Sequence, residues 1–367
     1  MIYSEDLIKT LKKNKISFFT GVPDSVLINL SSHIDSYSDS FHKIAVNEGS
    51  AIGIGIGYYL STKKIPCIYL QNSGLGNAIN PIISVAHQKV YSIPLLLLIG
   101  WRGSPGLKDE PQHKVNGKIT PKLLKLLNIE SCNLEKHQDL KKLNNLIKKS
   151  YKQKKIVACL IKNKVLKSKK QKKLKIQNNF FTSREKFIIH LLKLIKEKTK
   201  IVSTTGHISR ELMKIRSEKK LKKGRDFYMV GGMGHSNSVS LGMCLQSKKQ
   251  IICLDGDGSL LMHLGSMFTS GFSKKNNFKH ILLNNNVHES VGGQVTGAEL
   301  VKFKQLSKSL GYKSYFRISR NSEITSVLKN FLKNNKSSFL EVLIKLNMLR
   351  DLPRPKNLIE IKNNFMK

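Results

Sequence analysis

Two short groups of polar residues in the second half of the chain could together bind a metal ion and a phosphate group. The first is Asp255-Gly-Asp-Gly-Ser259 and the second is Asn284-Asn285, and each follows an apolar run that predicts a buried strand. If the two strands are parallel neighbours, Asp257 and Asn285 lie side by side at the carboxyl edge of the sheet, where open α/β sheets bind ligands. A carboxylate, an amide oxygen and a backbone carbonyl are hard donors that suit Mg²⁺, which keeps its other positions for phosphate oxygens.

The glycines of the first group support the same interpretation. Gly256 and Gly258 allow a tight turn and let the backbone approach a diphosphate closely. An isolated Gly-Asp-Gly is a common turn, so the motif alone would favour a structural role. Its position after a strand, together with the Asn284-Asn285 pair, favours a metal–diphosphate site instead.

The first half of the chain offers a carboxylate in a similar position. Glu48 follows a predicted strand and precedes a helix rich in glycine and isoleucine. A glutamate at a helix start is commonly there because the helix dipole favours it. At the carboxyl end of a strand, beside a helix that permits close packing, it is also a candidate for a buried acid. Burial would raise its pKa.

Two loops that follow predicted strands of the first half concentrate polar and charged side chains. They contain Asn72, Ser73, Arg102, His113 and Lys114. Ordinary surface loops would have a similar composition, but functional residues are also concentrated on loops that a rigid scaffold holds. His113 could act as an acid or base near neutral pH.

Strand and helix signals alternate through both halves, which predicts an α/β fold with mainly parallel sheets flanked by helices. The predicted strands are 16–20, 43–46, 65–70, 94–99, 155–161, 200–204, 227–230, 251–254, 280–283 and 339–344. A lysine-rich polar stretch separates the two sets and has the composition of a linker. We therefore expect a first domain over residues 1–165, a linker over 166–179 and a second domain over 180–367.

The chain is strongly basic, with 64 Lys and Arg against 24 Asp and Glu and a formal charge of +40. Such a balance ordinarily suggests nucleic acid or another anionic partner. However, much of the excess lies in residues 141–175, which contain no acidic residue, and aromatic residues are not interleaved with the basic ones as in proteins that stack bases. We interpret the charge mainly as compositional drift on solvated faces, with a minor role in attracting an anionic substrate, and expect no specific nucleic-acid partner.

The expected compartment is the cytoplasm. The five cysteines are scattered, odd in number and without a Cys-x-x-Cys pair, which favours reduced thiols. The longest apolar run, 93–100, is far too short to span a membrane, so we expect no membrane association. The amino terminus is typical of an amphipathic helix rather than of a signal peptide.

Nine short motifs, in this order along the chain, resemble those of the phosphonopyruvate decarboxylases, a family of enzymes that depend on thiamine diphosphate. They are Gly21-Val-Pro-Asp-Ser25, Asn47-Glu-Gly49, Gln71-Asn-Ser-Gly-Leu-Gly-Asn77, Gly100-Trp-Arg-Gly103, Asp109-Glu-Pro-Gln-His113, Thr204-Thr-Gly-His-Ile-Ser-Arg-Glu211, Gly231-Gly-Met-Gly-His235, Gly256-Asp-Gly258 and His288-Glu-Ser-Val-Gly-Gly-Gln294. The resemblance covers nearly the whole chain. It implies a pyrimidine-binding domain followed by a diphosphate-binding domain, and decarboxylation of 3-phosphonopyruvate to phosphonoacetaldehyde and CO₂ in phosphonate biosynthesis.

The resemblance also implies roles for individual residues. Glu48 would activate the aminopyrimidine ring of the cofactor, and Asp24 and His113 would handle protons after decarboxylation. Mg²⁺ would be bound by Asp257, Asn285 and the Val287 carbonyl. The other residues expected to contact the cofactor are Asn72, Ser73, Gly231, Met233, Gly256, Gly258 and Ser259. Within that set, Met233 would bend the cofactor and the Gly231 carbonyl would accept a hydrogen bond from its amino group.

The residues that would bind the phosphonate are the least specified by the resemblance. We expect them among Arg102, Lys114, Ser290, Gly292 and Gly293. The sequence also departs from the family pattern near these positions. Asn284-Asn285-Asn286 stands where Asp-Asn-Gly is expected, which leaves the metal-binding Asn in place, and Glu289 stands where Asp is expected. Val291 aligns with a Glu of pyruvate decarboxylases, so their proton-transfer arrangement is not expected here.

Several alternatives remain open at this point. A sulfopyruvate decarboxylase would use the same chemistry on a substrate with one fewer negative charge. A carboligase related to acetolactate synthase is disfavoured because those enzymes usually carry a third domain. A nucleic-acid-binding protein is suggested by the charge alone, and an inactive member of the fold would be expected to lack Glu48 or Asp257. In the family the cofactor lies between subunits, so we expect at least a homodimer.

Overall fold

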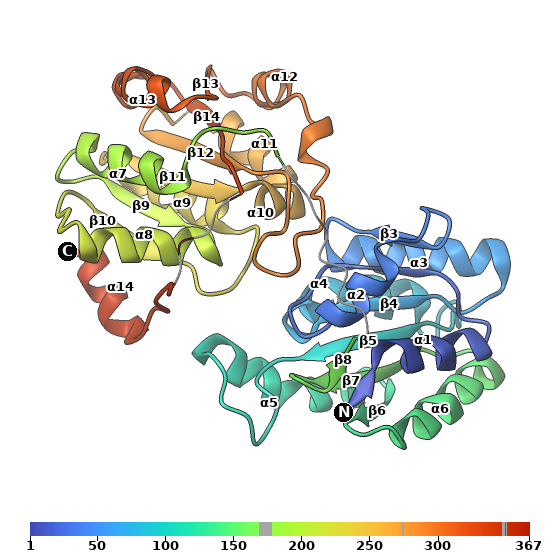
Figure 1. The fold of residues 1–367 in the computed structure, drawn as a ribbon. Helices are drawn as coiled ribbons and strands as arrows, with labels where there is room; N and C mark the ends of the chain where they lie inside the picture. Colours follow the sequence, from blue (N-terminus) through green and yellow to red (C-terminus); the bar gives the residue numbers. More distant parts are fainter. Residues whose placement is uncertain (169–177, 274, 347–348, 350) are drawn as a thin grey trace. The chain divides into compact units, whose positions relative to one another are not determined.

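The computed structural model describes residues 1–168, 178–273, 275–346, 349 and 351–367 (Figure 1). These residues form two compact units. The first unit contains the described residues before the gap at 169–177, together with 291–294, and the second contains the others. Most of the predicted linker over 166–179 lies outside the described residues.

The first unit is built on a six-stranded sheet in which every strand pair is parallel, in the order β3-β2-β4-β5-β7-β6. Its strands are β2 (Phe19–Gly21), β3 (His42–Ile44), β4 (Cys67–Gln71), β5 (Leu96–Trp101), β6 (Glu130–Leu134) and β7 (Val157–Lys162). A separate two-stranded sheet pairs β1 (Ile2–Tyr3) with β8 (Leu166–Lys167). The edge strand β6 was not predicted, because its sequence Glu-Ser-Cys-Asn-Leu lacks the continuous apolar run of a central parallel strand.

Helices cover both faces of this sheet (Figure 1). One face packs on α1 (Ser4–Lys13), α2 (Ile28–Ile34) and α6 (Asp139–Gln153), and the other on α3 (Glu48–Thr62), α4 (Leu75–Pro81) and α5 (Pro111–Leu126). Because strand side chains alternate, Leu96 and Leu98 of β5 belong to the first core, whereas Leu97 belongs to the second. Two of these helices, α3 and α6, end at lysines in the left-handed conformation, Lys63 with φ 59° and Lys154 with φ 46°.

The second unit repeats this plan with a six-stranded parallel sheet in the order β10-β9-β11-β12-β14-β13. Its strands are β9 (Lys200–Ser203), β10 (Arg225–Tyr228), β11 (Ile251–Gly256), β12 (Phe278–Asn284), β13 (Ser314–Ile318) and β14 (Ser338–Leu343). The edge strand β13 was not predicted. The expected pairing of β11 with β12 is present, with Gly256 opposite Leu283.

The second sheet also has helices on both faces (Figure 1). One core contains side chains of α7 (Arg184–Leu194), α8 (His207–Glu218) and α13 (Ile324–Lys333), and the other contains side chains of α9 (Ser236–Gln246), α11 (Gly265–Phe272) and α12 (Phe303–Ser309). The short α10 (Asp257–Met262) follows β11 directly, and α14 (Leu358–Met366) lies near the carboxyl terminus. The predicted fold class, two α/β units with parallel sheets flanked by helices, is confirmed. No helix among the described residues is long and apolar enough to cross a bilayer.

Two Gly→Ala substitutions should change stability in opposite directions. Gly21 lies in β2, where an added methyl group would overlap the backbone oxygen of Tyr69 on β4, so Gly21→Ala should destabilise the chain by about 1–3 kcal/mol. Gly53 lies inside α3 with open space where its methyl group would point, so Gly53→Ala should stabilise the chain by about 0.5–1 kcal/mol. Urea unfolding of both variants checks this pair, and equal shifts of the two midpoints would contradict it.

Candidate active site

Glu48 is a buried acid at the start of α3. Its exposed fraction is 6%, and its Oε2 accepts a hydrogen bond from the Asn77 side chain at 2.8 Å. Gly74 packs so closely on this carboxyl group that a side chain at that position would overlap it. Burial raises the pKa of Glu48, and the Asn77 hydrogen bond only partly opposes the shift. The buried environment therefore favours the protonated form of Glu48 more than exposure to water would.

Asp24 is a second buried acid of the first unit. It is fully enclosed in the loop after β2, where Gln71 Nε2 donates to Oδ1 at 2.5 Å and the Val26 N–H donates to Oδ2 at 3.1 Å. Burial raises its pKa, and these two donors only partly oppose the shift. Gly100 lies against the same carboxyl group, and a side chain there would overlap it.

Asn72 connects two loops of the first unit through its side-chain amide. Its Oδ1 accepts from the Arg102 N–H at 3.0 Å, and its Nδ2 donates to the Arg102 carbonyl at 2.9 Å and to Thr120 Oγ1 at 3.0 Å. Ser73 is exposed and donates to the Gln71 side chain at 2.8 Å. All polar groups of the Asn72 amide thus have partners within the unit, which fixes the start of the loop after β5.

Arg102 has an ionic partner in the same unit. Its Nε and Nη2 donate to the two carboxylate oxygens of Asp109 at 2.8 and 2.5 Å. Burial alone would raise the pKa of Asp109, but the hydrogen bonds from Arg102 and from two backbone N–H groups outweigh it and hold the pKa well below its usual range. On the neighbouring α5, His113 is partly exposed and Lys114 is exposed. Of these two expected phosphonate ligands, Arg102 and Lys114, Arg102 has its charge balanced by Asp109.

The second unit brings Asp257 and Asn285 together where β11 and β12 end. Both residues are 4% exposed, and the Asp257 carboxylate accepts from the Asn285 backbone N–H and, at 2.6 Å, from Thr296 Oγ1. Burial raises the pKa of Asp257 to about 7, because these donors compensate only part of the lost hydration. A buried carboxylate of this kind favours a bound cation, which would replace the proton.

The loop after β12 holds the other predicted metal-binding groups. Asn285 Oδ1 accepts from the Val287 N–H at 3.1 Å, so the side chain folds back over the turn that carries the Val287 carbonyl. Asn286 has φ 66°, a left-handed conformation that glycine adopts freely and that asparagine tolerates better than most other residues. This explains how the chain keeps the turn with Asn286 where the family pattern has Gly.

The predicted diphosphate-binding residues lie around α10. Gly256 is the last residue of β11, and Ser259 Oγ accepts from the Gly234 N–H at 3.0 Å and pairs with Thr204 Oγ1 at 2.8 Å. These bonds fix the loop 231–234, which contains the predicted Gly231 and Met233, against the start of α10. Gly258 packs against the His288 ring.

Three residues that were predicted to bind the phosphonate follow His288 in the sequence. They are Ser290, Gly292 and Gly293. Ser290 is exposed and its hydroxyl lies next to Gly206. Gly292 and Gly293 have φ 149° and 80°, conformations that favour glycine.

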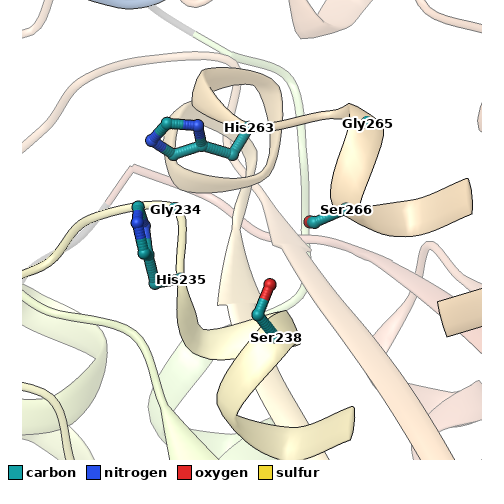
Figure 2. A pocket seen from close by; sticks show the side chains of 6 residues that line it. All are labelled: Gly234, His235, Ser238, His263, Gly265 and Ser266. Carbon is teal, nitrogen blue, oxygen red and sulfur yellow. The ribbon is translucent and has the colours of Figure 1, made fainter. Parts of the chain in front are cut away.

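A cavity of about 250 Å³ lies beside Gly234, and Figure 2 shows its lining. The lining residues are Gly234, His235, Ser238, His263, Gly265 and Ser266, which come from the ends of α9, α10 and α11. The His235 and His263 rings are nearly perpendicular, with centroids 4.5 Å apart. None of these residues belongs to the predicted site.

An ionic group beside the loop after β12 was not predicted. Arg184 at the start of α7 donates to Glu211 Oε2 and to Glu289 Oε2, both at 2.8 Å. Burial alone would raise the pKa of Glu289, but the neighbouring His207 and Arg184 outweigh it and keep the pKa below its usual range. Glu211 and Glu289 occur in quoted motifs, whereas nothing local in the sequence marks Arg184 as their partner.

Comparison with known proteins identifies the family of the chain. Residues 1–120 match the family described as thiamine pyrophosphate enzyme, N-terminal TPP binding domain, and residues 204–342 match the corresponding C-terminal TPP binding domain. A phosphonopyruvate decarboxylase from Streptomyces viridochromogenes is 30% identical over 97% of this chain and 92% of its own length. The chain belongs to the thiamine pyrophosphate-dependent decarboxylases.

Other decarboxylases of this family are similar over nearly the same length. A phosphonopyruvate decarboxylase from Streptomyces hygroscopicus is 29% identical over 97% of this chain and 91% of its own length. A sulfopyruvate decarboxylase from Methanosarcina acetivorans is 25% identical over 93% of this chain and 91% of its own length. The similarity therefore establishes the class of enzyme and the cofactor, thiamine diphosphate, and leaves two candidate substrates.

The described side chains fit this cofactor. Glu48, as a buried acid whose pKa is raised, suits a ring nitrogen with which it can share a proton. The oxygens of Asp257, Asn285 and Val287 suit a magnesium ion that holds a diphosphate. The two groups belong to different units.

The burial of Glu48 has a consequence for stability that can be measured without cofactor. Since its pKa is raised on folding, the stability associated with the protonated form is fully present below the usual glutamate pKa and is lost as the pH rises through the folded value. Glu48→Gln removes the ionisation, so it should stabilise the cofactor-free chain by about 1 kcal/mol at neutral pH. The gain should shrink towards about pH 4. Urea unfolding at both pH values checks this, and a variant that is destabilised at neutral pH would contradict it.

Proposed function

We propose that the chain catalyses the nonoxidative decarboxylation of 3-phosphonopyruvate to phosphonoacetaldehyde and CO₂, with thiamine diphosphate and Mg²⁺ as cofactors, as a step of phosphonate biosynthesis. The similarity to phosphonopyruvate decarboxylases over 97% of the chain carries the choice of substrate. The basic composition is consistent with a substrate that bears both a carboxylate and a phosphonate, because it raises the local concentration of anions.

In this proposal the second unit holds the diphosphate end of the cofactor. Asp257, Asn285 and the Val287 carbonyl would bind Mg²⁺, which leaves other coordination positions for diphosphate oxygens. The backbone around Gly256, Gly258 and Ser259 would approach the same diphosphate, as the short turn into α10 permits. Thr296 donates to Asp257 and keeps one of its oxygens oriented.

The first unit would control protons. Glu48 would share its proton with N1′ of the aminopyrimidine ring, which its buried position favours. Bound thiamine diphosphate would supply a nucleophilic carbon and an electron sink for the departing CO₂. Gly231 and Met233 would contact the cofactor rings, and Asp24 and His113 are the groups that we propose for proton transfer after CO₂ leaves.

Substrate recognition would come from the loops that carry the remaining predicted residues. Lys114 and the backbone near Ser290, Gly292 and Gly293 would contact the phosphonate. Arg102 is fixed by Asp109, so it would act as a rigid donor with part of its charge already neutralised. Sulfopyruvate is the second candidate substrate, because a sulfopyruvate decarboxylase is similar over 93% of the chain.

Phosphorus NMR with purified protein, thiamine diphosphate and Mg²⁺ tests the substrate. We expect conversion of phosphonopyruvate to phosphonoacetaldehyde, and much slower turnover of sulfopyruvate and pyruvate in parallel assays. Glu48→Gln should lower kcat by about 10²- to 10⁴-fold, the range that positioned acids and bases contribute. Turnover of sulfopyruvate without turnover of phosphonopyruvate would support the proposed cofactor and contradict the proposed substrate.

We also propose that the enzyme acts as a homodimer at least, in which Glu48 of one subunit and Asp257 of another serve the same cofactor. Mixing refolded Glu48→Gln and Asp257→Ala chains tests this, because a mixed dimer would contain one active site that carries neither substitution. Random pairing should restore about a quarter of the activity of an equal amount of unmodified protein. Each variant refolded by itself is the control, and a mixture no more active than these controls would contradict the shared site.

A further inference from the structure

A row of charged and polar side chains, of which Glu289 is half-buried and the others are buried, leads from the helices of the second unit to the proposed metal-binding loop. It consists of Glu211 on α8, Arg184 on α7, and Glu289 and Asn285 in the segment after β12. We propose that Glu289, held by Arg184, is a positioning residue that fixes the side-chain amide of Asn285 with its oxygen available to the metal ion. The inference rests on the metal-binding role proposed above for Asn285.

The hydrogen bonds of Glu289 define its position. Its Oε2 accepts from Arg184 Nη2 at 2.8 Å and from Asn285 Nδ2 at 3.3 Å. The same oxygen lies 3.8 Å from His207 Nδ1, so one carboxylate oxygen faces three nitrogen atoms. The Glu289 carboxylate therefore lies close to the Asn285 amide and to the side chains of Arg184 and His207.

A carboxylate can select one orientation of an amide. An ionised carboxylate only accepts hydrogen bonds, so it attracts the amide nitrogen of Asn285 and repels the amide oxygen. The oxygen is consequently directed to the opposite side, where it accepts from the Val287 N–H at 3.1 Å. Because a carbonyl-type oxygen has two lone pairs, this bond leaves one of them for a cation. The reversed amide would present N–H groups to the metal ion instead.

Arg184 is what allows an ionised Glu289 at this place. Arg184 is 4% exposed and lies between two carboxylates, since its Nε also donates to Glu211 Oε2 at 2.8 Å. Glu211 is itself fully buried and accepts from the Leu349 N–H at 3.4 Å. A buried charge without a partner is strongly unfavourable, so loss of Arg184 would leave two carboxylates poorly compensated. The ionic group thus connects α7 and α8 to the proposed metal-binding loop.

The chain offers a matched control in the adjacent asparagine. Asn284 is also buried, and its Nδ2 donates to the carboxylate of Glu341 at 3.1 Å, as Asn285 donates to Glu289. Asn284 is not a proposed metal ligand. Glu289→Gln and Glu341→Gln therefore make the same chemical change beside neighbouring asparagines, and only the first should act on the metal ion.

The test measures binding of thiamine diphosphate to the full chain by calorimetry at increasing Mg²⁺. Glu289→Gln should raise the Mg²⁺ concentration needed for half-maximal binding by about 10- to 100-fold, as is typical when a residue that orients a metal ligand is changed. Glu341→Gln should leave this concentration unchanged. Arg184→Gln should resemble Glu289→Gln, and Arg184→Lys, which keeps a donor and a charge, should recover part of the effect. Turnover of Glu289→Gln should approach that of the parent at saturating Mg²⁺.

The outcomes separate this inference from the proposed function. Equal effects of Glu289→Gln and Glu341→Gln, or an unchanged Mg²⁺ dependence in Glu289→Gln, would overturn the positioning role. Asp257→Ala and Asn285→Ala test the metal site itself, and both should abolish the Mg²⁺ dependence of binding. If these two variants bind the cofactor with the parent's Mg²⁺ dependence, the proposed metal site is wrong. If they lose it and Glu289→Gln does not, only the positioning role fails.

Discussion

The parallel pairing of β11 with β12 is the constraint on which the second unit's site depends. Parallel neighbours end at the same edge of a sheet, and the register that sets Gly256 opposite Leu283 brings Asp257 to the level of Asn284, the last residue of β12 and the neighbour of Asn285. A slip by one residue would turn every side chain of the shifted strand to the opposite face and separate the two oxygen donors. The apolar side chains on both faces of these strands secure the register, so the core determines where the proposed ligands lie.

Both units keep carboxyl groups out of water at a cost in stability. Burial raises the pKa of Glu48, Asp24 and Asp257, which means that each would be more stable protonated or beside a cation. Each has one side-chain donor that limits the cost, from Asn77, Gln71 and Thr296 respectively. Strained or desolvated groups of this kind are concentrated at functional sites, where they serve the reaction rather than folding.

Much of this architecture could be predicted from the sequence, because central parallel strands are continuous apolar runs and the proposed ligands follow them directly. The edge strands β6 and β13 were missed, since an edge strand is only partly buried and its sequence is mixed. The pairing of Arg102 with Asp109 and the contact of Arg184 with Glu289 also escaped prediction. The second pair is 105 positions apart in sequence, and such contacts depend on helix placement that no local pattern encodes.

The lysines that end α3 and α6 show a second effect of the basic composition. Helices commonly end at glycine in the left-handed conformation, and an L-residue with a side chain pays about 1–2 kcal/mol to adopt it. Among the described residues, ten other than glycine have positive φ, and five of these are lysines: Lys15, Lys63, Lys154, Lys164 and Lys220. The enrichment in lysine therefore affects the backbone conformation as well as the charge. Each lysine in the left-handed conformation lowers the free energy of unfolding.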